Sequence, residues 1–223
     1  MAEDHDKDEI TTVKAKAPPV DLSPQECVVT GPLDPCIIVI FGASGDLTSR
    51  KLVPALYNLY LNHGLPKPFI IVGASRTNLS HDEFREKLKS SYEATENSDL
   101  SRWNEFAANL YYQPVIYDAL QSYEELAGYL RKLDEKYQTG GNRVFDLAVP
   151  PSLYPVIAEM LGKAGLAQEG ENGKGWSRIV VEKPFGRDLK SAVELDQTLH
   201  QSFKEHQIFR IDHYLAKETI QNI

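Results

Sequence analysis

The sequence predicts an α/β fold: a doubly covered, Rossmann-like parallel sheet with helices on both faces. Three observations support it. Short apolar runs alternate with longer amphipathic segments from residue 36 onward, which is the pattern of consecutive strand–helix–strand units. The first run, residues 36–41 (CIIVIF), is apolar throughout, as a strand covered on both faces requires. No run approaches the ~20 apolar residues of a membrane-spanning helix, so no membrane partner is expected.

The first elements form one strand–helix–strand–helix series. Residues 36–41 (CIIVIF) predict a buried strand that runs into the loop GASGDL. A helix is expected over residues 51–62, where leucines recur at helical spacing. The second strand is expected at residues 69–75 (FIIVGAS). Ser80 and Glu83 form a capping-box pattern, which predicts that the next helix begins there.

The middle of the chain is predicted less regularly. A short helix is expected over residues 103–110 and a third strand over residues 111–117, with Pro114 placing part of that strand at a sheet edge. Ser122 and Glu125 repeat the capping-box pattern and predict another helix start. A polar, glycine-rich loop is expected further on. The remaining elements are strands at 143–149, 178–184 and 207–212, helices at 152–163 and after Asp188, and the loop at 168–176.

Charge and cysteine usage narrow the function classes. A net charge of −8 argues against a nucleic-acid partner, which requires a basic surface. Cys27 and Cys36 are the only cysteines, too few for a disulfide scaffold or a four-ligand zinc site, so no metal site is expected. The N-terminus lacks the apolar segment of a secretory signal. A cytoplasmic location is the simplest expectation.

The loop GASGDL has the features of a dinucleotide phosphate loop. Gly42 would permit the tight turn after the first strand, and Gly45 would let the backbone approach a pyrophosphate at the start of the next helix. The spacing is G-x-x-G instead of the commoner G-x-G-x-x-G. A purely structural strand-to-helix turn would use the same glycines, so this alternative stays open.

The end of the second strand indicates which dinucleotide is bound. The strand ends at Ser75-Arg76-Thr77, where NAD-specific folds usually carry an acidic residue for the ribose 2′-hydroxyl. An arginine flanked by hydroxyls suits a 2′-phosphate instead. The sequence therefore favours NADP; the alternative reading of Arg76 is an ordinary surface arginine.

Two further motifs follow strands that end at the same edge of the predicted sheet. In EKPFGRD, Lys183 would point into the site, although most single lysines are simply solvated. In RIDHYLAKE, three donors, His213, Tyr214 and Lys217, suit a dianionic phosphoryl group. Asp212 could orient a histidine base or could merely cap the helix that is expected to follow. The sequence stops inside that helix, which we interpret as a truncation before a further domain.

Together, GASGDLTSRKL, EKPFGRD and RIDHYLAKE resemble the glucose-6-phosphate dehydrogenase family over residues 36–223. The resemblance implies oxidation of glucose 6-phosphate at C1 to 6-phosphogluconolactone with hydride transfer to NADP+, the first step of the oxidative pentose phosphate pathway. It also implies a Rossmann-like coenzyme domain followed by a larger α+β domain that builds a homodimer or homotetramer.

The resemblance also implies a domain organisation and a role for each motif residue. Residues 1–34 would be an acidic tail, residues 35–210 the NADP-binding domain, and residues 211–223 the start of the substrate and dimerisation domain. Lys51 would lie toward the cleft. The expected cofactor residues are Gly42, Ala43, Ser44, Gly45, Asp46 and Leu47 for the pyrophosphate, Arg76 for the 2′-phosphate, and Lys183, which would contact both coenzyme and substrate. The expected substrate residues are His213, Tyr214 and Lys217, with Asp212 and Lys183 as catalytic residues.

Two departures from the family pattern matter. The family often has a tyrosine where this chain has Asp146, so an aromatic contact to the nicotinamide ribose would be lost. The family's general base is a histidine downstream of RIDHYLxKE, and none of the other histidines matches it: His5, His63, His81, His200 and His206. This chain alone is therefore expected to be nearly inactive. The alternatives are a non-catalytic NADP-binding fragment or paralogue, or a sugar oxidoreductase of the family that also uses an EKP motif; that family lacks RIDHYLxKE.

Overall fold

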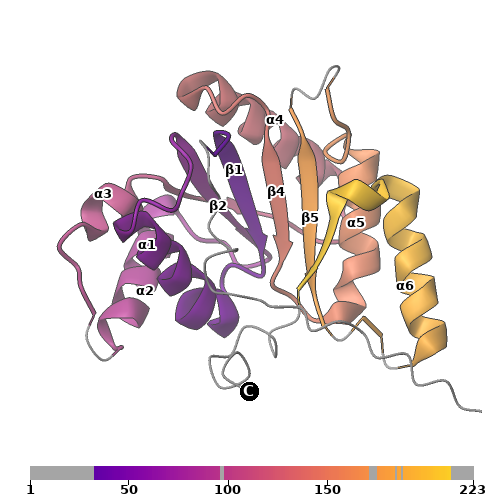
Figure 1. Ribbon diagram of the computed structural model, residues 1–223, viewed down its shortest axis with the longest axis horizontal. Helices are drawn as coiled ribbons and strands as arrows, with labels where there is room; N and C mark the ends of the chain where they lie inside the picture. The colour runs from indigo at the N-terminus through magenta and orange to yellow at the C-terminus, as the bar shows by residue number, and fades with distance from the viewer. Residues whose placement is uncertain (1–32, 96–97, 171–174, 184, 187, 212–223) are drawn as a thin grey trace, which may run out of the picture. The chain divides into compact units, whose positions relative to one another are not determined.

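The structure is a computed structural model that describes residues 33–95, 98–170, 175–183, 185–186 and 188–211. Its strands form one sheet in the order β3-β2-β1-β4-β5-β6, and every neighbouring pair is parallel (Figure 1). The strands are β1 (Cys36–Phe41), β2 (Phe69–Ser75), β3 (Leu110–Pro114), β4 (Arg143–Leu147), β5 (Ser177–Glu182) and β6 (Ile208–Ile211). The predicted Rossmann-like parallel sheet is confirmed.

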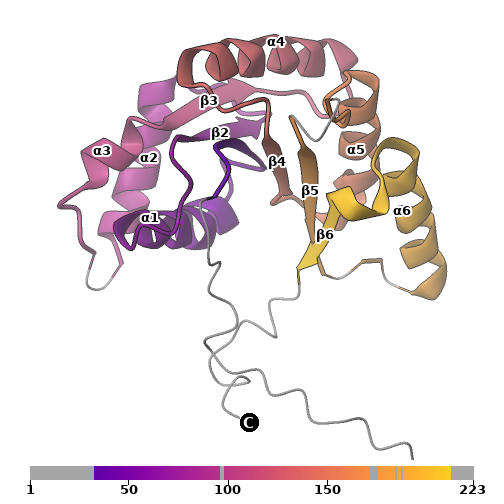
Figure 2. The same ribbon diagram turned by 45° about the horizontal axis from the view of Figure 1, so that its top comes forward.

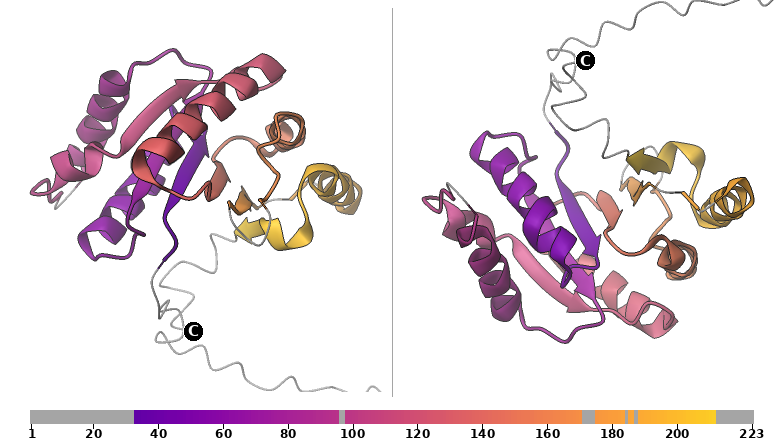
Figure 3. Two further views of the ribbon diagram at one scale, coloured as in Figure 1. Left: turned by 90° about the horizontal axis from the view of Figure 1, so that it is seen from above. Right: turned by 90° about the horizontal axis from the view of Figure 1, so that it is seen from below.

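Helices lie on both faces of this sheet (Figures 2 and 3). One set packs on β1, β2 and β3 through an aromatic cluster that includes Tyr57, Phe84 and Phe106. The other set packs on the opposite face, where Leu126, Ile157 and other aliphatic side chains are fully buried. The first set is α1 (Val53–Leu61), α2 (His81–Glu93) and α3 (Trp103–Ala107), and the second is α4 (Leu120–Tyr137), α5 (Tyr154–Lys163) and α6 (Leu189–Ser202).

Both faces of β2 are therefore covered, and every residue of β2 is buried. This burial explains why its sequence is apolar without alternation. β3 is an edge strand and ends at Pro114, as the proline requires, because it cannot donate a hydrogen bond to a further strand. Within the described part of the chain, no helix is long and apolar enough to cross a membrane.

Three local predictions were wrong. The helix after the phosphate loop begins before residue 51, with a π-helical segment, η1 (Thr48–Leu52), in which the Val53 N–H donates to the Thr48 carbonyl. β3 runs from Leu110 to Pro114, so Leu110 is not in the preceding helix and residues 115–117 are not in the strand. Ser122 does not cap α4, because its N–H already donates to the Ala119 carbonyl in the first turn. The predicted capping box at Ser80 is confirmed, and α6 also begins with a capping box, formed by Asp188 and Ser191.

The predicted tail (residues 1–34) and the predicted start of a second domain (residues 211–223) fall almost wholly outside the described residues and stay predictions, as do the predicted domain boundaries. Two short 3₁₀ segments, η2 (Pro151–Leu153) and η4 (Glu205–Gln207), connect the later elements. Because all strands are parallel, their carboxyl ends meet at one edge of the sheet. The strand order reverses beside β1, and that is where open α/β sheets bind ligands.

Candidate functional site

The phosphate loop begins at Gly42, directly after β1. Gly42 has a φ of +82°, and a β-carbon there would lie 2.1 Å from the carbonyl oxygen of Ala148. The Gly45 N–H donates to the Gly42 carbonyl at 2.8 Å. Buried Thr48 donates its hydroxyl to the same carbonyl at 3.3 Å. These contacts fold the loop tightly and leave Gly45 and Asp46 exposed at the start of the helix, which suits the approach of a pyrophosphate.

A cluster of hydroxyls surrounds Ser44, the central residue of the loop. The Ser44 Oγ accepts hydrogen bonds from Ser75 Oγ at 2.9 Å and from Thr77 Oγ1 at 3.1 Å. Arg76 is exposed between these two residues in the chain. The cluster combines hydroxyl donors with a guanidinium, which is the chemistry that a 2′-phosphate needs.

The structure adds two residues that sequence analysis missed. Lys87 of α2 donates from Nζ to the carbonyl of Ser44, and this brings a second positive charge to the loop. Tyr117, which follows β3, accepts a hydrogen bond from the Gly42 N–H at 3.1 Å. Both residues lie far from the loop in sequence, and no motif marks them. The amphipathic pattern places Lys87 on the exposed side of its helix but does not distinguish it from Lys89.

The carboxyl end of β4 forms the other wall of the loop. Ala148 lies against Gly42, and Asp146 is half-buried in β4 opposite Ile40 of β1. Asp146 thus lies near the carboxyl end of β4. A separate cleft of about 640 Å³ is lined by residues that include Pro150, Pro155 and Leu195. Of the predicted site residues that the structure describes, from Gly42–Leu47, Arg76 and Lys183, none lines that cleft.

Lys183 comes directly after β5 and is exposed. Its N–H donates to the carbonyl of Ile211 at 3.1 Å, so the end of β5 is joined to the end of β6. The buried hydroxyl of Tyr154 lies 3.4 Å from the N–H and 3.5 Å from the carbonyl of Glu182. Burial raises the pKa of Tyr154, which keeps this hydroxyl neutral. The backbone that presents Lys183 is thus held from both sides. Lys51, by contrast, is exposed on η1, the segment that follows the phosphate loop.

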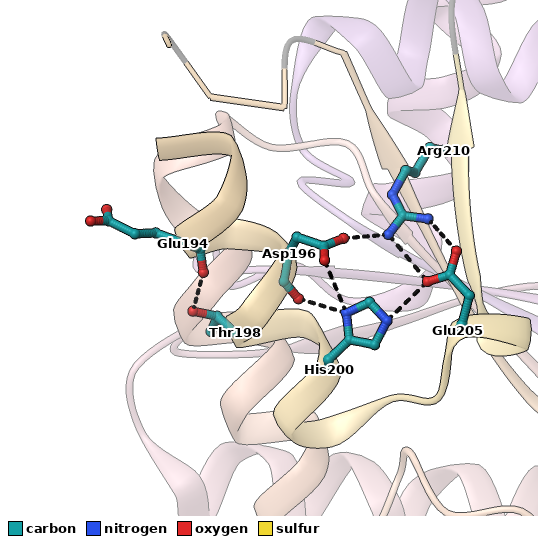
Figure 4. A network of polar contacts seen from close by, with 6 residues as sticks. All are labelled: Glu194, Asp196, Thr198, His200, Glu205 and Arg210. Carbon is teal, nitrogen blue, oxygen red and sulfur yellow. Dashed lines mark hydrogen bonds and ion pairs between the residues drawn. The ribbon is translucent and has the colours of Figure 1, made fainter. Parts of the chain in front are cut away.

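The predicted substrate residues Asp212, His213, Tyr214 and Lys217 lie outside the described residues. Their motif begins at Arg210, which is described and lies on β6. Arg210 pairs with Asp196 of α6 at 2.6 Å and with Glu205 of η4 at 2.9 Å (Figure 4). His200 lies between the same two carboxylates. This network fixes β6, the strand that leads into the motif. Arg210 pairs with Val181 of β5, and the next residue, Ile211, pairs with Glu182, which directly precedes Lys183.

Among the described residues, no group of three or more histidine, cysteine, aspartate or glutamate side chains is placed to hold a metal ion. The site instead gathers backbone N–H groups, hydroxyls and cations.

Comparisons with known proteins identify the family. Residues 39–222 match the family model described as "Glucose-6-phosphate dehydrogenase, NAD binding domain". The chain belongs to the glucose-6-phosphate dehydrogenase family. The match covers the whole phosphate loop and both later motifs, so the predicted resemblance is confirmed.

Individual relatives agree with this assignment. The chain is 48% identical over 188 residues to glucose-6-phosphate 1-dehydrogenase of Aggregatibacter actinomycetemcomitans, covering 84% of this chain and 37% of that protein. It is 43% identical over 204 residues to the Chlamydia pneumoniae enzyme, covering 90% of this chain and 39% of the relative. A solved glucose-6-phosphate dehydrogenase in complex with glucose 6-phosphate superposes with a TM-score of 0.74 at 35% identity, covering 87% of this chain and 40% of that chain.

The chain thus spans about two fifths of the length of the relatives that it matches. The matched part is the family's coenzyme domain, and the comparisons support the NADP expected from Arg76. The residues present fit this coenzyme: the loop at Gly42 and Gly45 is open to a pyrophosphate, and Ser44, Thr77 and Arg76 offer hydroxyls and a positive charge beside it.

Proposed function

We propose that this chain is the coenzyme-binding part of an enzyme that oxidises glucose 6-phosphate at C1 to 6-phosphoglucono-lactone and transfers the hydride to NADP+. The observation that carries the proposal is the meeting of two features at one sheet edge. The phosphate loop with Arg76 lies at the ends of β1 and β2, Lys183 follows β5, and β6 ends with Arg210 and Ile211, the first two residues of the RIDHY motif.

The proposed roles follow this arrangement. The loop residues Gly42 to Leu47 bind the pyrophosphate, and Arg76 binds the 2′-phosphate. NADP+ supplies the hydride acceptor when bound. Lys183 contacts the sugar and the coenzyme from the end of β5. The family match supports these assignments because it includes every motif on which they rest.

The remaining roles fall on residues whose placement is not described. His213, Tyr214 and Lys217 bind the substrate phosphate, since their donors suit a dianion. Asp212 orients the general base, a histidine of the longer family members. We further propose a homodimer or homotetramer of the full-length protein in the cytoplasm. A solved relative in complex with glucose 6-phosphate supports the choice of substrate.

The test uses the full-length protein and follows NADPH absorbance with glucose 6-phosphate or free glucose. We expect turnover with glucose 6-phosphate. Lys217→Ala should raise KM for glucose 6-phosphate by ~10- to 100-fold, the equivalent of one charge-assisted hydrogen bond, and should hardly change KM for free glucose. Lys190→Ala, at a lysine that is 86% exposed on α6, is the matched control. Equal losses on both sugars would contradict the assignment of Lys217, and no turnover would contradict the proposed reaction.

A further inference from the structure

We infer that Tyr117 is a positioning residue of the coenzyme site. Its hydroxyl positions the phosphate loop at Gly42, and its ring positions Arg76, the residue proposed to bind the 2′-phosphate. The inference rests on the proposed coenzyme-dependent function. Tyr117 belongs to none of the motifs discussed above. It reaches the site from the segment after the edge strand β3, across the end of β2.

The hydroxyl of Tyr117 holds the first glycine of the loop. The Gly42 N–H donates to the Ala74 carbonyl at 2.9 Å and to the Tyr117 hydroxyl at 3.1 Å. The loop's first peptide is thus fixed both by the neighbouring strand and by a side chain. Burial raises the pKa of Tyr117, so the hydroxyl stays neutral at physiological pH. A neutral hydroxyl adds no negative charge where a pyrophosphate would bind.

The ring of Tyr117 lies under the side chain of Arg76. The guanidinium carbon of Arg76 is 5.5 Å from the ring centre, within the range of a cation–π contact. Arg76 is exposed, and a long exposed side chain loses rotamer freedom when it binds an anion. A ring that already favours one placement of the guanidinium reduces that loss. Tyr117 thereby favours the coenzyme that carries the extra phosphate.

Tyr117 is itself held rigidly, which a positioning role requires. Only 6% of its surface is exposed. Its ring meets Phe41 edge-on at 6.1 Å between centres. The buried hydroxyl of Tyr123 donates to the Tyr117 carbonyl at 3.0 Å. The packed core therefore fixes Tyr117, and Tyr117 in turn fixes Gly42 and Arg76.

The test measures NADP and NAD binding by titration calorimetry on the 223-residue chain and its variants. Tyr117→Phe keeps the ring and removes the hydroxyl, so both affinities should fall by the same factor, about two- to tenfold for one hydrogen bond. Tyr117→Leu also removes the ring, so the NADP-to-NAD affinity ratio should fall by a further factor of about two to five. In an Arg76→Ala background, Tyr117→Leu should leave that ratio unchanged, an outcome that general loosening of the fold would not produce.

Tyr111→Phe is the matched control. Tyr111 also has an arginine over its ring, with the guanidinium carbon of Arg85 at 5.6 Å from the ring centre. Its hydroxyl forms a hydrogen bond with the hydroxyl of Tyr137 and not with the phosphate loop. This variant should bind both coenzymes as wild type does. If wild type binds NADP and the Tyr117→Phe and Tyr117→Leu variants bind it with the same affinity, the inference alone is overturned. An equal loss of affinity in Tyr111→Phe would also overturn the inference alone. A wild-type chain that binds neither coenzyme would overturn the proposed function together with the inference.

Discussion

Replacing Gly42 with alanine is the most severe small change that the phosphate loop can receive. The residue has a φ of +82°, which disfavours any side chain. The added β-carbon would lie 2.1 Å from the Ala148 carbonyl oxygen and 2.9 Å from Val149 Cγ1. Ordinary contact begins near 3.4 Å. The end of β1 and the end of β4 would therefore have to separate by about 1 Å in a close-packed region.

Two costs add. The left-handed backbone costs an L-residue about 1–2 kcal/mol, and overpacking against atoms that cannot rotate away typically costs about 1–3 kcal/mol. We therefore expect the free energy of unfolding to fall by about 2–5 kcal/mol. The displaced loop should also bind NADP more than about tenfold more weakly, since only 1.4 kcal/mol of misplacement produces that factor.

Gly165→Ala is the matched control. Gly165 has a similar φ of +71°, but nothing lies within 4 Å of its missing β-carbon. It should lose only the backbone contribution and bind NADP normally. Urea unfolding gives the two free energies, and a fluorescence titration gives the two affinities. If Gly42→Ala is as stable as Gly165→Ala and binds NADP like wild type, then our account of the loop is incorrect.

Two further predictions concern ion pairs and pH. Asp134→Ala should lower the free energy of unfolding by about 2–4 kcal/mol, because it leaves Arg143 without its ion-pair partner; the Arg143 guanidinium lies 2.6 Å from Asp134, and both side chains are 15% exposed. The same change at Asp82, which is 91% exposed, should lower it by less than about 1 kcal/mol in the same urea assay. Equal losses would contradict the burial argument. A hydrogen bond to the Asp196 backbone and the nearby carboxylates raise the pKa of His200 above its usual 6.5. The stabilisation that protonated His200 contributes is therefore complete below pH 6.5 and disappears as the pH rises through the higher pKa of the folded state. His200→Gln should flatten this part of the profile of unfolding free energy against pH, and an unchanged profile would refute this role of His200.

The sequence predicted those features that local chemistry determines. The residues of β2 are apolar from Phe69 to Ala74 because both faces are covered, and the predicted bounds match the observed ones. Ser80 and Asp188 have a side chain at the right spacing to cap the next helix, and both do so. Gly42 was predicted to make a tight turn, and its positive φ agrees.

The features that the sequence did not predict depend on packing between distant segments. Ser122 and Glu125 have the same capping pattern as Ser80 and Glu83, yet α4 starts two residues earlier than Ser122. Tyr117 and Lys87 reach the loop only because β3 and α2 pack beside it. Such contacts arise from the tertiary arrangement, and no spacing in the chain encodes them.

We propose that Arg76 makes this chain bind NADP in preference to NAD, because only NADP carries the 2′-phosphate. Wild type and Arg76→Ala are titrated with each coenzyme under the same conditions. We expect saturable NADP binding by wild type and a loss in Arg76→Ala of ~10- to 100-fold for NADP, as expected when a charge-assisted contact is removed, with little change for NAD. Equal losses for both coenzymes, or no saturable NADP binding by wild type, would contradict it.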